Sequence, residues 1–93
     1  MAPVQGGVFA ISVAAEMTSM QIQNLRVYER RGLVEPGRTS GGTRLYSEAD
    51  IERLHRIRDL LAAGLNLAGI AAVLELEGEN ARLRAQVARL KAK

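Results

Sequence analysis

The sequence predicts a mainly α-helical domain with a small β-hairpin, followed by a C-terminal helix that pairs with another helix. Three observations predict this class. Apolar residues recur at helical spacing along most of the chain, and a glycine-rich stretch with turn signals interrupts them between Pro36 and Gly42. After Val73 the apolar spacing tightens to seven residues. A chain of 93 residues supports one domain with one modest core.

Two short helices are expected at the start of the domain. Residues 1–8 hold a proline and two glycines and are expected to form a mobile arm. Ser12 is a good N-cap for a helix over residues 13–17. A second helix follows over residues 21–31 and stops at Gly32. Two helices joined by a tight turn are typical of a helix-turn-helix, whose second helix can enter the DNA major groove.

The stretch "LVEPGRTSGGTRLYS" is interpreted as a β-hairpin. Its "PG" indicates a turn or bulge, and its "SGG" can adopt positive φ at the tip. An ordinary surface turn is one alternative. A nucleotide-binding phosphate cradle is another, but the stretch has no Gly-Lys-Ser/Thr ending and no preceding buried strand. Together with the two helices, the hairpin predicts a winged helix-turn-helix.

Positive charge gathers on this middle part of the chain. Residues 21–46 hold five arginines against Glu29 and Glu35, whereas the rest of the chain is nearly neutral. Both tyrosines of the chain also lie there. Such a distribution favours a face that binds a polyanion, and a solvated loop is the alternative. The arms of the hairpin are expected to carry Arg38 and Arg44, with Leu45 facing inward and Tyr46 near the base.

Two further helices should complete the core. Ser47 opens the third helix, with Asp50 three residues later as a weaker form of the capping box. Gly64 ends that helix, and Asn66 caps a fourth one. His55 lies beside the apolar stripe of the third helix, where a boundary position is the expected role because nothing pairs with it.

The tail carries a short heptad seam. Its two lines are Val73, Asn80 and Val87, and Leu76, Leu83 and Leu90. A helix this short is marginal alone, so it should pack on a partner. A homodimer is favoured over a helix that folds back onto its own domain. Charge leaves the orientation open, because Glu79 would meet the partner's Arg84 in a parallel pair, whereas Glu77 would approach the partner's Lys91 in an antiparallel one.

Composition excludes several functional classes. The chain has no cysteine and only one histidine, which excludes disulfides, thiolate sites and a histidine metal cluster. No nucleophile has a base beside it in the pattern, so no catalytic residues, no metal and no cofactor are expected, and the chain is not expected to be an enzyme. No apolar run approaches the length that spans a membrane, and a cytoplasmic protein without a membrane partner is expected.

Two motifs resemble a known family. "NLRVYERRGLVEP" resembles the second-helix signature of MerR-type regulators, and "GGTRLYSEADIERL" resembles their wing and third helix. Within that family, "ISVAAEM", "RTSGG" and "LNLAGIAAVLELE" are most similar to the HspR-like heat-shock repressor subgroup. The resemblance runs from Phe9 to Leu76. It implies a DNA-binding domain over residues 9–75, between the arm at 1–8 and a coiled-coil dimerisation helix at 76–93.

The resemblance also implies roles for particular residues. Arg26 and the polar face around Gln21, Gln23 and Asn24 would enter the major groove. Tyr28 would reach a backbone phosphate, as would Arg44 from the wing, with Arg38 and Tyr46 nearby. Val27 replaces the first tyrosine of the usual pair, and Ser19 stands where the turn usually has glycine. These departures from the family pattern affect which operator sequence the protein would recognise, and not the class of protein to which it is assigned.

The expected function is a sequence-specific transcriptional regulator of double-stranded DNA, more precisely a repressor that binds an inverted-repeat operator as a homodimer. The HspR-like resemblance adds a DnaK-type chaperone as co-repressor, and the family pairs its dimerisation helices antiparallel. The protein would act in the cytoplasm, at the nucleoid. Two alternatives are an architectural or excisionase-like winged helix that bends DNA, and a coiled-coil adaptor whose basic face meets an acidic protein.

Overall fold

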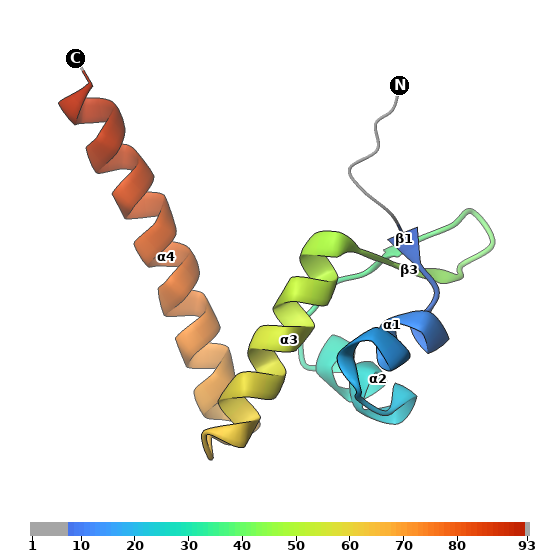
Figure 1. Ribbon diagram of the computed structural model, residues 1–93. Coiled ribbons are helices and arrows are strands. Elements are labelled where there is room, and N and C mark those ends of the chain that lie inside the picture. Colours follow the sequence, from blue (N-terminus) through green and yellow to red (C-terminus); the bar gives the residue numbers. More distant parts are fainter. Residues whose placement is uncertain (1–7, 93) are drawn as a thin grey trace.

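The computed structural model describes residues 8–92 of the chain (Figure 1). The elements in chain order are β1 (Val8–Phe9), α1 (Ile11–Thr18), α2 (Ile22–Arg30), β2 (Gly37–Arg38), β3 (Arg44–Ser47), α3 (Glu48–Ala62) and α4 (Leu67–Lys91). The predicted fold class is confirmed, since the chain is mainly helical with a small antiparallel sheet and a long C-terminal helix. Most of the expected mobile arm, residues 1–7, lies outside the described residues.

The first helix begins earlier than the sequence indicated. Ala10, in the extended conformation, is the N-cap of α1, and its carbonyl oxygen accepts a hydrogen bond from the Ala14 N–H at 2.9 Å. The prediction that Ser12 caps this helix was therefore wrong. The reason lies in the sheet: Phe9 is paired with Tyr46, so the chain leaves a fixed strand and turns directly into the helix.

The sheet has three antiparallel strands in the order β1-β3-β2. Val8 pairs with Ser47 in β3, so this residue belongs to the sheet and not to the arm that was expected over residues 1–8. On the other side of β3, Arg38 pairs with Arg44. The hairpin prediction held for these two strands. At its tip only Gly42 takes a positive φ, +89°, among the "SGG" residues.

One core joins the helices to the sheet. Its largest fully buried side chains are Tyr46, Leu25, Leu54, Ile57, Ile70 and Thr18. Helix α3 begins as predicted, because the Ser47 hydroxyl accepts from the Asp50 N–H at 3.1 Å while the Asp50 carboxylate accepts from the Ser47 N–H at 2.9 Å. Asn66 caps α4 through the Gly69 N–H at 2.7 Å, also as predicted.

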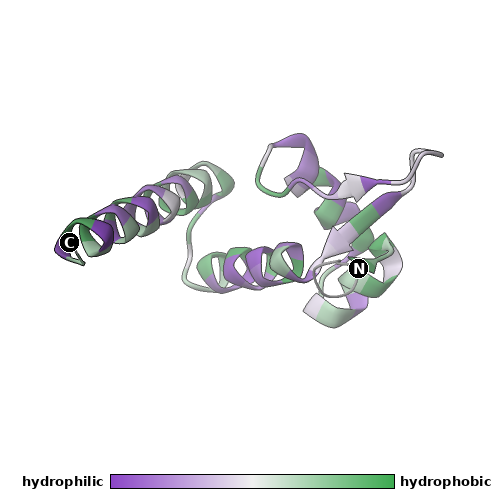
Figure 2. Ribbon diagram, turned by 90° about the horizontal axis from the view of Figure 1, so that it is seen from above, coloured by the Kyte–Doolittle hydropathy of each residue, from purple (hydrophilic) through white to green (hydrophobic). Residues whose placement is uncertain are grey.

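Helix α4 is one continuous helix that leaves the domain. It runs through the boundary expected between residues 75 and 76, and Leu74 is its last buried residue. Figure 1 shows α4 diverging from α3, and Figure 2 shows apolar and polar residues alternating along its length. The radius of gyration is 15.2 Å, whereas a compact chain of this length has roughly 12 Å. None of the helices in residues 8–92 is both long and apolar enough to cross a membrane.

Candidate nucleic-acid interface

The exposed face of α2 is polar and basic. Leu25 and Tyr28 are buried, so the opposite face carries Gln23, Arg26 and Arg30, at positions i, i+3 and i+7. All three side chains are exposed. The DNA major groove is wide enough to admit an α-helix, and amide and guanidinium groups are suited to reading base edges there. This face therefore has the shape and chemistry of a recognition helix.

Two further predicted residues stand at the start of α2. Gln21 is its N-cap, and its carbonyl oxygen accepts from the Asn24 N–H at 3.0 Å. The side chains of Gln21 and Asn24 are both exposed, and that of Gln21 makes no capping hydrogen bond. Val27 is half-buried and packs against the core. The structure thus brings Gln21, Gln23, Asn24 and Arg26 together on the first turns of one helix.

The turn that leads into α2 is braced by α3. Ser19 takes the left-handed conformation with φ 56°, a region of backbone geometry in which glycine is favoured. The Arg58 Nη1 group donates to the Thr18 carbonyl oxygen at 2.9 Å. His55, half-buried as its boundary position predicted, places Nε2 3.4 Å from the Met17 carbonyl oxygen. These contacts hold the end of α1 from which α2 departs.

The wing is the hairpin formed by β2, β3 and the turn between them. Its two arginines share a carboxylate from α2. Glu29, in the last turn of α2, accepts from Arg38 Nη2 through Oε2 at 2.7 Å and from Arg44 Nε through Oε1. Arg38 also donates through Nη1 to the Gly42 carbonyl oxygen at 2.9 Å. These ion pairs connect the recognition helix to both strands of the wing.

The charged forms of this cluster stabilise one another. Burial by itself raises the pKa of Glu29, but the hydrogen bonds and charges of Arg44 and Arg38 outweigh it, so the pKa lies below its ordinary value of 4.5. The hydrogen bond to Glu29 in turn raises the pKa of Arg44. Glu29 and Arg44 are therefore ionised near neutral pH, and one carboxylate partly offsets the charge of two guanidinium groups.

Both tyrosines lie in the core. Tyr28 is 5% exposed and Tyr46 0%, and burial raises the pKa of each hydroxyl. The expectation that Tyr46 stands beside the DNA at the base of the wing was wrong for its side chain. In a strand, alternate residues face opposite sides, and it is Tyr46, paired with Phe9, that faces the core while Leu45 is only half-buried.

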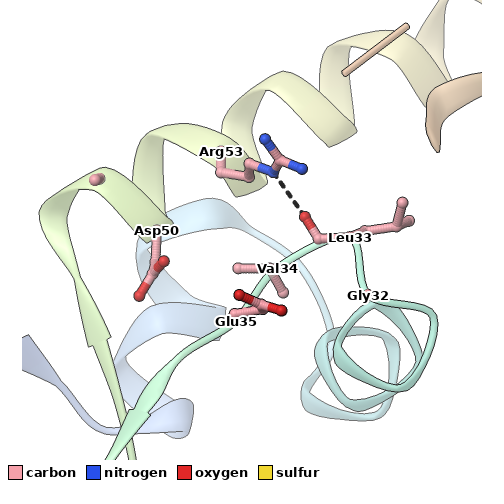
Figure 3. Close-up of a pocket in the computed structure, with 7 residues that line it drawn as sticks. Gly32, Leu33, Val34, Glu35, Asp50 and Arg53 are labelled. Carbon is pink, nitrogen blue, oxygen red and sulfur yellow. Dashed lines mark hydrogen bonds between the residues drawn. The ribbon is translucent and has the colours of Figure 1, made fainter. Parts of the chain in front are cut away.

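A shallow depression of about 600 Å³ lies between α3 and the loop that follows α2 (Figure 3). There Arg53 Nε donates to the Leu33 carbonyl oxygen at 2.7 Å, which fixes the loop on α3. Glu35 and Asp50 also line the depression, but Asp50 is engaged in the helix cap. Within residues 8–92, no group of three or more His, Cys, Asp or Glu side chains could hold a metal ion.

The outer half of α4 exposes an apolar stripe. Leu76 is 67% exposed and Leu90 65%, and Leu83 and Val87 are nearly half exposed. Val73 is half-buried and begins the stripe. Two shallow grooves of about 410 and 390 Å³ run along it. Asn80, in the middle, accepts from Arg84 Nε at 2.6 Å. The six residues of the predicted seam therefore lie on one face of one helix.

Three residues that form or support the exposed face of α2 and the wing were not among the predicted site residues. Arg30 shares the face of Gln23 and Arg26, which helical spacing alone could have indicated. From the sequence, Glu29 was considered only as one negative charge in a basic segment, because its two ion-pair partners are 9 and 15 residues away. Arg58 reaches a backbone atom 40 residues earlier, and no local pattern signals such a contact.

Comparisons with known proteins give consistent results. A family model described as MerR HTH family regulatory protein matches residues 9–77. A Streptomyces coelicolor protein, provisionally named heat shock protein HspR, is 48% identical over 86 residues, covering 91% of this chain and 57% of its own length. The HTH-type transcriptional regulator GlnR of Bacillus anthracis is 44% identical over 66 residues, covering 71% of this chain and 51% of its own. The chain thus spans about half the length of the curated relatives it matches.

A solved structure shares the fold. HiNmlR, a MerR family regulator lacking the sensor domain and crystallised on promoter DNA, superposes with a TM-score of 0.69 at 24% identity, covering 91% of this chain and 76% of its own. The relatives are regulators, which confirms the prediction that this chain is not an enzyme.

Proposed function

This chain belongs to the MerR family of helix-turn-helix regulatory proteins, and from that premise we propose that it is a sequence-specific, homodimeric repressor that binds an inverted-repeat operator in double-stranded DNA. One observation carries the proposal. The polar face of α2 is exposed beside a wing that carries two arginines, and Glu29 links the two. The site of action would be the cytoplasmic nucleoid.

Helix α2 would read the bases. Arg26 has the paired donors that match the O6 and N7 acceptors of guanine, and the amides of Gln21, Gln23 and Asn24 match adenine. Arg30 lies on the same face of α2 as Arg26, and we expect it to contact the DNA as well. The phosphate contact expected of Tyr28 is not part of the proposal, because its side chain is buried in the core. Val27 is half-buried and would also pack the helix onto the core.

The wing would grip the DNA backbone. Arg44 and Arg38 lie opposite each other on adjacent strands, so one phosphate or two neighbouring ones could be contacted together. Contacts of this kind set the position of the protein on the duplex and make affinity fall with salt. Tyr46 is excluded from direct contact because its side chain is buried.

Helix α4 would form the dimer. An antiparallel pairing puts Val73 opposite Leu90, Leu76 opposite Val87 and Asn80 opposite Leu83, so all six seam residues are used. Within one chain Glu77 forms an ion pair with Arg56 of α3, so the pairing rests on the apolar seam and not on the contact expected between Glu77 and the partner's Lys91. Two copies related in this way would present two α2 helices to successive half-sites on one face of the duplex.

Repression with a DnaK-type chaperone is the finer part of the proposal. Its support is the likeness to a protein that carries the name heat shock protein. The measurement is operator affinity with and without the DnaK of the same organism. We expect tighter binding when DnaK is present, and equal affinity in both conditions would remove the chaperone from the proposal.

The DNA-reading role is tested by Arg26→Ala. Binding to an operator fragment should weaken by at least about tenfold, whereas binding to a scrambled duplex should change little, because a bidentate base contact contributes roughly 1–3 kcal/mol of discrimination. Arg89→Ala is the matched control, since it removes the same charge from the exposed far end of α4. If both variants lose affinity equally, only net charge matters and the proposal fails.

A further inference from the structure

The ion pairs of Glu29 with the wing arginines place a negative charge beside the residues that are expected to bind phosphate. An acidic side chain on a surface that binds a polyanion normally weakens binding, because it repels phosphate. Glu29 nevertheless lies within hydrogen-bonding distance of both wing arginines, and its side chain is only 20% exposed. The negative charge of Glu29 by itself would weaken DNA binding, so any favourable effect of this residue on binding must come from its contacts with the two arginines.

Strand register gives one reason for its presence. Arg38 and Arg44 are direct cross-strand partners, and like charges in such a pair repel each other. Glu29 approaches this pair from α2, with one carboxylate oxygen toward each guanidinium group. The carboxylate thus allows two arginines to stand side by side, which concentrates positive charge where a single phosphate group could meet it.

The choice of donor atoms gives a second reason. Arg44 uses Nε toward Glu29, so within residues 8–92 neither of its terminal amino groups has a protein partner. Arg38 uses one N–H of each terminal amino group, toward Glu29 and the Gly42 carbonyl oxygen. Glu29 therefore fixes the guanidinium of Arg44 by its inner nitrogen and leaves the outer fork, which is the part that binds phosphate bidentately.

The third reason is the position of Glu29 in the fold. Helix α2 packs chiefly on α1, whereas β2 and β3 pack on each other and β3 on α3. The Glu29 ion pairs run directly from α2 to both strands. They therefore couple the helix that would read bases to the arginines that would hold the backbone.

We propose that Glu29 is a positioning residue of the DNA interface: it orders the guanidinium groups of Arg38 and Arg44 before DNA arrives and fixes the wing relative to α2. This inference rests on the proposed DNA-binding function. Ordering two long side chains in advance removes part of the entropic cost of binding. The gain applies to specific binding, where α2 and the wing must fit the same duplex at once, and not to loose electrostatic contact.

The test compares Glu29→Gln with Glu35→Gln in fluorescence anisotropy, on an operator fragment and on a scrambled duplex of equal length. Glu35 is exposed, lies six residues away and makes no ion pair within residues 8–92, so its substitution gives the effect of charge alone. We expect Glu29→Gln to lower operator affinity by roughly tenfold. Both variants should bind the scrambled duplex equally well or better than the wild-type protein.

Two additional variants separate positioning from folding and from charge. Glu29→Asp keeps the charge but is one methylene shorter, so it should also lose operator affinity. In an Arg38→Ala, Arg44→Ala background, Glu29→Gln should have no further effect, because its partners are gone. Unchanged circular dichroism and retained binding to the scrambled duplex show that each variant is folded.

The outcomes are distinct. If the wild-type protein binds its operator and Glu29→Gln binds it as tightly as Glu35→Gln does, the positioning role is refuted and the proposed function stands. A loss that persists without the two arginines also refutes it. If the wild-type protein does not distinguish operator from scrambled duplex, the proposed function itself fails.

Discussion

At the residue scale, the buried hydroxyl of Tyr46 is the polar atom that the fold leaves unsatisfied. It has no hydrogen-bond partner among residues 8–92, and its side chain is fully buried. A hydroxyl in that condition costs stability because it has lost its hydrogen bonds to water. The ring, in contrast, fills the space between β3 and the helices.

Tyr46→Phe is therefore expected to raise the free energy of unfolding, by about 1 kcal/mol, while leaving operator affinity unchanged. Urea denaturation and anisotropy measure the two quantities. Tyr28→Phe is the control, because the Tyr28 hydroxyl is not among the unsatisfied atoms. A loss of operator affinity in Tyr46→Phe would show that the hydroxyl reaches DNA after all.

The Glu29 ion pairs predict an acid dependence. The pKa of Glu29 in the folded protein lies below 4.5, so the ion pairs stabilise the fold fully above that value and lose their contribution as pH falls through the lowered pKa. The difference in unfolding free energy between wild-type protein and Glu29→Gln should thus be constant near neutral pH and shrink in acid. A difference that grows as pH falls would contradict the assignment.

What the sequence revealed at this scale depended on the range of the contact. The caps at Ser47 and Asn66 were predictable because donor and acceptor are three residues apart. The partners of Glu29 and Arg58 were not, since they are brought together only by the fold. Tyr46 was misplaced because its neighbour Leu45 was read as the inward residue of the strand.

At the scale of elements, the junction between β3 and α3 decides how the wing joins the core. Ser47 is both the last residue of β3 and the N-cap of α3, so strand and helix meet without a loop. Its capping box with Asp50 is complete. The direction of α3 is therefore set at the residue where the wing ends.

Ser47→Ala should lower the free energy of unfolding by about 1 kcal/mol, because the Asp50 N–H loses its partner. Thermal unfolding checks this value. Ser40→Ala is a suitable control, since Ser40 is exposed in the wing turn and its side chain makes no hydrogen bond within residues 8–92. Equal effects of the two substitutions would mean that the capping box contributes nothing.

The prediction for α4 concerns the orientation of the pair. The chain has no cysteine, so introduced thiols report contacts without background. In the antiparallel register, Leu76→Cys and Val87→Cys proteins should form a mixed disulfide when oxidised together, and Leu76→Cys alone should not. A disulfide between two copies of Leu76→Cys would indicate parallel helices and overturn the proposed register.

Most elements were predictable from the sequence, and the exceptions have physical causes. Strand β1 is two residues long, which is too short for an alternating pattern, and it exists because Phe9 and Val8 pair with β3. The expected division at residue 75 falls within α4, which is continuous there and whose last buried residue is Leu74. Gly78 is tolerated in the helix, since nothing crowds it and its φ is not positive.

At the scale of the whole molecule, the proposed DNA-binding surface and the apolar stripe lie on separate parts of the chain. The helix-turn-helix, the wing and α3 share one core, while α4 beyond Leu74 makes no buried contact with it. That shape suits the proposed homodimer, in which a second copy would cover the stripe. The sequence motifs predict the family of the protein. They do not predict the operator sequence, because base preference depends on side-chain contacts that form only in the complex with DNA.

Selection of genomic fragments by the purified protein at physiological salt, followed by sequencing, tests the central claim most directly. A dimeric, sequence-specific regulator should retain fragments that share an inverted repeat, with half-sites spaced to face one side of the duplex. Retention of fragments with no common sequence would contradict this claim and indicate an architectural protein. Failure to retain any fragment would contradict DNA binding itself and leave the coiled-coil adaptor as the role to test.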